Sequence, residues 1–187
     1  MRTTLAIACL AGLVAANLAG GAVTPQITQT AIAGAKLGRA PAAYRQALDG
    51  TGRWARGVPG NPGIPDNYAR LVFRKAKVSV YFVDGTNTGA LVTTWNKRYR
   101  TAAGVGPCST LERLKAAYGA RLTPSKFNTI DGVVYAYTLG KNLIFASNNQ
   151  STVEVVGLYN GSDPKVSEPG GSLSYAGFIT LSETRCS

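Results

Sequence analysis

The chain of 187 residues contains no histidine, and it has few acidic residues and few cysteines. Nine Asp and Glu stand against 20 Lys and Arg, which gives a formal net charge of +11, and there are three cysteines. Without histidine the chain cannot build a Ser-His-Asp or Cys-His catalytic site, or a zinc site with histidine ligands. Three cysteines are also too few for a cysteine-rich metal site. The composition therefore favours a binding protein that uses neither metal nor cofactor.

The acidic residues do not suggest a catalytic pair either. A glycosidase that works with two carboxylates needs them to face each other across a cleft. Each acid of this sequence instead has a local explanation at a helix end, a turn, a helix surface or a loop, and Asp84-Gly85 and Asp131-Gly132 are typical turn sequences. Glu154 lies inside an apolar run, where the alternation of a strand would point it towards solvent. We therefore predict that the chain is not an enzyme.

The first 22 residues have the layout of a secretory signal peptide. Arg2 precedes an uncharged run from Leu5 to Leu18, and small residues follow at Ala19–Ala22. We predict that residues 1–22 are cleaved and that the mature protein is secreted or stays in the cell envelope. The alternative is an uncleaved membrane anchor, although the apolar run is about as short as a spanning helix can be.

Removal of this segment leaves two cysteines, Cys108 and Cys186. An even pair in an exported protein predicts a structural disulfide. The alternative is a free catalytic thiol, but the chain has no histidine to activate one. Cys9 lies too early in the apolar run to be the lipidated cysteine of a lipoprotein.

After a flexible segment (residues 23–36), a pattern of one helix and three strands occurs twice. Helices are predicted within residues 37–50 and 105–119, because apolar residues recur there at helical spacing and a glycine follows. Ser109 or Thr110 can cap the second helix. We predict an α+β fold in which two αβββ repeats form a mostly antiparallel sheet with both helices on one face. The repeats cover residues 37–104 and 105–187, the strands are predicted at 68–73, 77–83, 90–95, 133–137, 142–146 and 153–159, and a C-terminal strand follows at 173–181.

This pattern resembles a known type of secreted domain. The resemblance lies in Leu37-Gly38 to Gly50 with Val78–Phe82, and in Val105-Gly106 to Gly119 with Leu143–Phe145. These stretches are similar to the tandem αβ repeats of β-lactamase-inhibitory-protein-like domains and of the outer-membrane-assembly lipoproteins of the SmpA/OmlA (BamE) type. The resemblance implies a sandwich-like α/β fold, an exposed sheet that contacts other proteins, and no catalysis. It supplies no motif at the contact positions, so no site residue follows from it.

Exposed aromatic residues are the first candidates for a binding surface. Residues 51–67 are predicted to form a loop that holds Trp54, because the run at 58–65 is rich in proline and glycine. A long ordered loop in a small domain is often functional, although a mobile surface excursion is the alternative. Aromatic residues that share the outer face of the sheet would form a protein-binding patch, and core packing is the other explanation for them. They are Tyr81, Trp95, Tyr99, Tyr135, Tyr137 and Tyr159.

Basic residues interleaved with aromatic residues are the second candidates. One group surrounds the turn between the first two strands and another follows the third strand, so both can lie at the same end of the sheet. Such a surface suits an anionic polymer. The alternative is that positive charge only keeps an exported protein soluble. The two groups are Arg70, Arg74, Lys75 and Lys77, and Lys97, Arg98 and Arg100, with Trp95 and Tyr99 between them.

Two binding functions follow from the sequence. The first is a protein-interaction or inhibitor-like module for an extracellular or envelope protein, and the alternative is a module that binds an anionic envelope polymer. Nucleic acid is not expected as a physiological partner of an exported protein, and membrane contact is expected only if residues 1–22 are retained. Salt should weaken the polymer contact far more than the protein contact. The candidate binding residues are Trp54, Arg70, Arg74, Lys75, Trp95, Lys97, Arg98, Tyr99 and Arg100.

Overall fold

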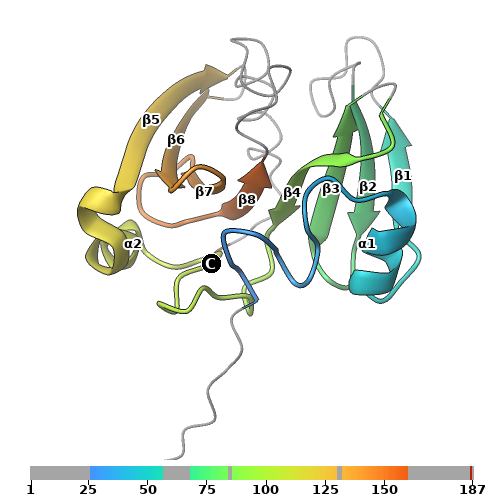
Figure 1. Ribbon diagram of the computed structural model, residues 1–187. Helices are drawn as coiled ribbons and strands as arrows, with labels where there is room; N and C mark the ends of the chain where they lie inside the picture. Colours follow the sequence, from blue (N-terminus) through green and yellow to red (C-terminus); the bar gives the residue numbers. More distant parts are fainter. Residues whose placement is uncertain (1–25, 57–67, 84–85, 130–131, 160–185, 187) are drawn as a thin grey trace, which may run out of the picture.

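A single antiparallel sheet dominates the fold (Figure 1). The computed structural model describes residues 26–56, 68–83, 86–129, 132–159 and 186. The predicted signal peptide, the proline- and glycine-rich run and the predicted strand at 173–181 lie outside the described residues. The elements, in chain order, are α1 (Pro41–Ala47), β1 (Arg53–Arg56), β2 (Tyr68–Phe73), β3 (Val78–Val83), β4 (Gly89–Thr94), α2 (Leu111–Tyr118), a 3-10 turn (Gly119–Arg121), β5 (Leu122–Thr129), β6 (Gly132–Leu139), β7 (Leu143–Ser147) and β8 (Val155–Tyr159).

The sheet consists of two four-stranded meanders joined at their last strands. Its eight strands follow the order β1-β2-β3-β4-β8-β7-β6-β5, and every neighbouring pair is antiparallel. The pairing of β4 with β8 runs from Leu91 opposite Tyr159 to Thr94 opposite Val156. The predicted α+β class is confirmed. Within the described residues, however, each helix is followed by four strands and not by the three that were predicted.

Both additional strands, β1 and β5, lie at the edges of the sheet. β1 falls inside the segment that was predicted to be a loop, so that prediction is wrong for Arg53–Arg56. β5 contains Pro124, which lacks the N–H that an inner strand needs for its ladder of hydrogen bonds. An edge strand tolerates proline because only one side of it is paired.

The two helices begin differently. α1 starts with Pro41, and no side chain caps it. α2 is capped as predicted by Thr110, whose Oγ1 accepts a hydrogen bond from the backbone N–H of Arg113 at 3.1 Å. The hydroxyl of Ser109 accepts instead from the N–H of Gly106, at 3.0 Å.

Both helices pack on the same face of the sheet, which we call the helix-bearing face. Tyr44 of α1 and Leu114 of α2 are buried in one cluster with Val80, Val92 and Phe145 of the strands. The segment before α1, predicted to be flexible, is folded from residue 26 onwards: Ile27 and Ile32 are buried in this cluster, and the N–H of Ile27 bonds the carbonyl of Arg100 at 3.1 Å.

The opposite, helix-free face is also partly buried. Its apolar cluster contains Tyr81, Leu91, Val134, Ile144 and Val155, each exposed by 5% or less. In β3 the alternation is regular, because Val78, Val80 and Phe82 belong to the helix-bearing face and Tyr81 to the other. The centre of the sheet is therefore apolar on both faces.

The predicted disulfide is present. It joins Cys108, which lies just before α2, to Cys186 near the C-terminus, with the two Cα atoms 5.2 Å apart. The backbone N–H of Cys108 also bonds the carbonyl of Val153 at 2.6 Å. The bond therefore fixes the C-terminal end of the chain beside the start of α2 and the approach to β8.

Candidate functional site

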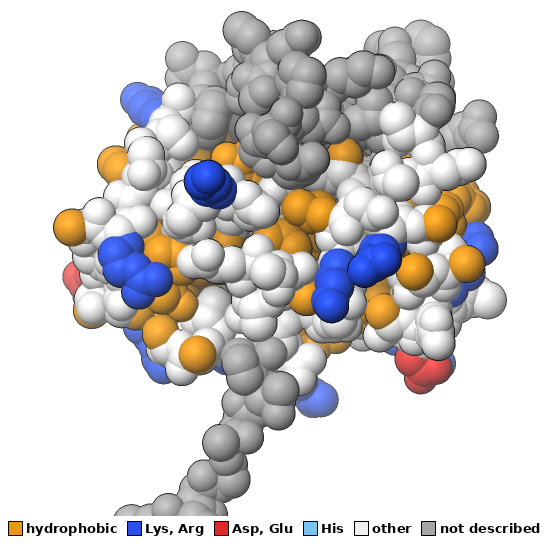
Figure 2. All heavy atoms as spheres, viewed as in Figure 1, with side chains coloured by type: hydrophobic (Ala, Val, Ile, Leu, Met, Phe, Trp, Pro, Cys, Tyr) orange, Lys and Arg blue, Asp and Glu red, His pale blue; other side chains and the backbone are white. Residues whose placement is uncertain are grey.

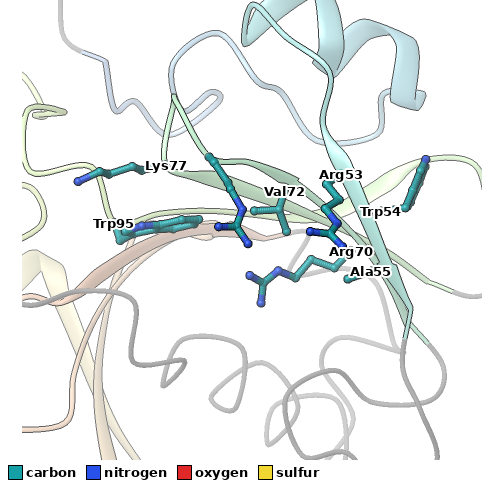
Figure 3. Close-up of a pocket in the computed structure, with 8 residues that line it drawn as sticks. Arg53, Trp54, Ala55, Arg70, Val72, Lys77 and Trp95 are labelled. Atoms are coloured by element: carbon teal, nitrogen blue, oxygen red, sulfur yellow. The ribbon is translucent and has the colours of Figure 1, made fainter.

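A basic pocket with a cavity volume of about 620 Å³ lies on the helix-free face, over β1, β2 and the ends of β3 and β4 (Figure 3). None of the described residues that line it is acidic. Its walls combine cationic side chains with apolar and aromatic ones, which is the composition expected for binding an anionic group that also has an apolar part. The lining residues are Arg53, Trp54, Ala55, Arg70, Val72, Arg74, Lys77 and Trp95.

The register of β1 against β2 brings three of these residues together. Arg53 pairs with Val72, and Ala55 pairs with Arg70. Since alternate residues of a strand share a face, Arg53 and Ala55 lie on the same side of the sheet as Arg70 and Val72. Figure 3 shows the side chains of Arg53 and Arg70 extending into the same space, with Trp54 on the other side of β1.

Arg70 is the most buried of the cations, with 9% of its surface exposed. Its guanidinium carbon lies 5.8 Å from the centre of the Tyr81 ring. A guanidinium above an aromatic face is held in place by the attraction between its charge and the ring quadrupole. The pocket therefore has a positively charged group at its floor that is fixed before any ligand arrives.

The other end of the pocket is closed by the turns that follow β2 and β4. The N–H of Trp95 bonds the carbonyl of Lys77 at 3.2 Å, and the side-chain amide of Asn96 bonds the carbonyl of Ala76 at 3.0 Å. These contacts place the two basic stretches of the sequence at the same end of the sheet. Exposed Lys97 and Arg98 continue on the turn beyond Trp95.

The structure thus brings together Arg70, Arg74 and Trp95 from the predicted set. Lys75 lines a neighbouring hollow instead. Trp54, which is 43% exposed, packs its ring 5.2 Å from that of Phe82 on the helix-bearing face. Its side chain therefore lies apart from the cations, on the far side of β1.

Tyr99 and Arg100 also lie away from the pocket. Tyr99 packs against the core of the helix-bearing face. The guanidinium of Arg100 donates to the carbonyl of Tyr99 at 2.8 Å, and burial together with the nearby charge of Arg113 lowers the pKa of Arg100. The second basic stretch therefore lies beside the pocket only at Trp95 and the turn that follows it. Tyr99 and Arg100 do not line the pocket.

The candidate tyrosines do not form one exposed patch. Tyr81 lies on the helix-free face but is only 1% exposed, and Tyr159 is half-buried on that face. Tyr137 packs on the helix-bearing face, and Tyr135, two residues earlier in β6, lies on the same side with Lys126 5.8 Å from its ring centre. Trp95 is the member of the set that lines the pocket.

The prediction for Glu154 was wrong, because this residue precedes β8 and is half-buried. Its carboxylate accepts hydrogen bonds from the backbone N–H of Asn148 at 3.0 Å and from the side-chain amide of Asn149 at 3.2 Å. Burial raises the pKa of Glu154, and the hydrogen bond from Asn148 partly offsets this rise. Glu154 therefore holds the turn between β7 and β8 through its hydrogen bonds with Asn148 and Asn149.

Arg53 is the pocket residue that sequence reasoning missed. Arg53 lies in a segment that the sequence predicts to be a loop. A strand of only four residues shows too little alternation of polar and apolar side chains to be predicted as a strand. In the view of Figure 2, basic side chains form separate groups and acidic side chains occupy small areas. Among the described residues the acids are Asp49, Glu112 and Glu154.

Comparisons of the chain with protein-family models, with curated proteins and with solved structures find no match. Within the described ranges, no helix is long and apolar enough to cross a membrane. The same residues contain no group of three or more Cys, Asp or Glu side chains that could hold a metal ion.

Proposed function

We propose that this protein is an exported, non-catalytic binding module that holds a partner protein through the helix-free face of its sheet. One observation carries the proposal: the basic pocket brings Arg53, Arg70, Arg74 and Lys77 together in one cavity that Trp95 also lines. Arg and Trp are enriched among the residues that dominate the binding energy of protein interfaces. The partner surface would be acidic, because the described walls of the pocket carry positive charge only.

The shape of the site favours a protein partner over a long polymer. Ala55, Val72 and Trp95 place apolar surface between the cations. A polyanion chain would instead need a continuous basic track. Tyr99 interrupts such a track because it packs on the helix-bearing face, and the guanidinium of Arg100 bonds the carbonyl of Tyr99. A concave basic pocket with apolar walls suits a discrete acidic side chain in a folded or extended protein segment.

The organisation into two repeats and the export of the chain belong to the same proposal. The order of one helix followed by a four-stranded meander occurs twice, which supports two repeats of the type αββββ. The Cys108–Cys186 disulfide supports an oxidising compartment outside the cytoplasm.

An anionic envelope polymer is the second candidate partner. Exposed Lys75, Lys97 and Arg98 extend the positive surface around the same end of the sheet. Contacts of this kind release counterions and therefore weaken steeply with salt.

The test is capture from an envelope extract by the purified, disulfide-bonded protein, at low and at high salt. Three proteins are compared: the wild type, the double variant Arg74→Glu/Lys77→Glu, and the charge-matched control Arg45→Glu/Lys141→Glu at exposed positions outside the pocket. We expect one protein partner to be retained at high salt by the wild type and the control, and lost by the pocket variant. Capture of a polymer that disappears with salt would favour the second candidate. Equal capture by all three proteins would place the binding surface elsewhere.

A further inference from the structure

A second hollow, with a cavity volume of about 440 Å³, adjoins the basic pocket. The two cavities share Arg53, Val72 and Arg74 in their walls. They are therefore neighbouring compartments around the paired ends of β1 and β2. The second hollow is lined by Leu48, Asp49, Gly50, Thr51, Arg53, Val72, Phe73, Arg74, Lys75 and Ala76.

The two compartments differ in chemistry. The second hollow contains the apolar side chains of Leu48, Phe73 and Ala76, and Leu48 and Phe73 are buried to 6% and 3% exposure. It also contains a carboxylate, from Asp49, whereas no described residue of the basic pocket is acidic. An anionic group is attracted to the basic pocket, and an apolar group is accommodated beside it. Further negative charge in the second hollow would be opposed by Asp49.

The link between α1 and β1 gives the second hollow a fixed wall. A Cβ atom at Gly52 would lie 2.7 Å from Cδ1 of Leu71 and 2.9 Å from Cζ of Phe73. The backbone of the link therefore runs directly against the side chains of β2, and a larger residue at Gly52 would force Leu71 or Phe73 to move. A cavity with such a wall is formed before the ligand binds, which lowers the entropic cost of binding.

We propose that the two compartments form one groove that binds an extended segment of a partner protein, with an acidic side chain in the basic pocket and an apolar side chain in the second hollow. This inference rests on the proposed function, since it names the part of the partner that the basic pocket and the adjoining hollow recognise. Side chains two residues apart in an extended segment point the same way and are about 7 Å apart, so one short segment can fill both compartments. A uniformly anionic polymer would place charge beside Asp49 and would leave apolar surface unused.

The experiment measures the binding of fluorescently labelled synthetic peptides to the disulfide-bonded protein by anisotropy. The peptides have a Gly/Ser background with one Asp and, two to four residues before or after it, one Leu. Matched peptides carry Asn in place of the Asp or Ser in place of the Leu, and inorganic polyphosphate is the polymer probe. We expect the best peptide to lose roughly tenfold or more in affinity when Ser replaces its Leu, because an apolar group in a fitted pocket contributes at least that much.

Two variants test the cation that both compartments share and the second hollow alone. Arg74→Glu should abolish binding of every Asp peptide. Thr51→Trp, which fills the second hollow from its exposed rim, should remove the preference for Leu and leave the weaker binding of the Asp-only peptide. Gln46→Trp adds the same side chain at an exposed position of α1 outside both compartments and should change nothing.

The outcomes separate this inference from the proposed function. Equal affinity of the Leu and Ser peptides, or no binding of any peptide, would overturn the groove, while capture of a partner protein would still support the proposed function. Binding of polyphosphate that is lost in Arg74→Glu, with no peptide bound, would overturn both the groove and the protein partner.

Discussion

Removal of the disulfide should destabilise the protein more than any other single change in the described structure. The bond joins residues separated by 78 positions, so it closes a loop that spans most of the second half of the chain. The perturbation is the double variant Cys108→Ser/Cys186→Ser, which removes the bond and leaves no unpaired thiol at either position.

The magnitude follows from the length of the loop. Closing a loop of this size removes conformational entropy from the unfolded chain, and the chain-entropy relation gives about 4.5 kcal/mol at 25 °C for a separation of 78 residues. Small domains have unfolding free energies of about 5–15 kcal/mol, so the loss would be a third or more of the total. The neighbouring hydrogen bond from the N–H of Cys108 to Val153 should persist, because it involves only backbone atoms.

The assay is urea unfolding followed by tryptophan fluorescence and circular dichroism, for the variant and for the wild type with and without a thiol reductant. We expect the reduced wild type to unfold at the same lower midpoint as the variant, and the variant to be unaffected by reductant. A midpoint difference equivalent to less than about 1 kcal/mol, obtained with the slope of the transition, would refute the entropic reasoning.

Three further changes test the packing and the polar contacts of the fold. Gly89→Ala should destabilise by about 1–3 kcal/mol, because its Cβ would lie 2.8 Å from Cζ of buried Tyr44, as a urea midpoint will show. Thr110→Ala removes the cap of α2 and should cost about 1 kcal/mol, measured in the same way. Burial raises the pKa of Glu154, so the folded state holds this proton more tightly than the unfolded chain does. This group therefore stabilises the fold most below the pKa of an unfolded glutamate, and its contribution is lost as the pH rises through the folded pKa. Relative to Glu154→Gln, the wild type should become less stable as the pH rises from below the pKa of an unfolded glutamate through the higher folded pKa, as unfolding titrations at several pH values will show.

Each of these three predictions has either a matched control variant or an outcome that would contradict it. Gly50→Ala adds a methyl group where no atom lies within 4 Å and should leave the stability nearly unchanged, in contrast to Gly89→Ala. Thr30→Ala removes a threonine outside the helices and should leave α2 unaffected. A stability difference between wild type and Glu154→Gln that does not vary with pH would show that burial of this carboxylate does not shift its titration.

Local patterns determined much of the fold. Six strands and both helices were predicted within a few residues of their observed positions, because alternation and helical spacing are properties of short segments. The Cys108–Cys186 bond followed from the two cysteines that remain after the predicted signal peptide, and the cap of α2 followed from Thr110 and the apolar helix that it precedes. Each of these predictions can be made without knowing which strands are neighbours in the sheet.

Tertiary structure alone decided the edges of the sheet. β1 has four residues and β5 contains Pro124, so neither carries a strong strand signal of its own. Each forms because a neighbouring strand, β2 or β6, offers a full row of hydrogen-bonding groups beside it. The position of Glu154 under the turn between β7 and β8 likewise depends on contacts with Asn148 and Asn149.

The candidate site shows the same division. The sequence predicted Arg70, Arg74 and Trp95 as candidate binding residues, and the structure shows that all three line one pocket. Only the register of β1 against β2 added Arg53 to them. Only the faces of the strands turned the side chain of Trp54 away from these cations and placed Tyr99 on the helix-bearing face. A shift of one residue in that register would turn every side chain of β1 to the other face, and no local property of four residues specifies it. The composition of the chain thus determined that the site is basic, and the pairing of distant strands determined which basic side chains meet.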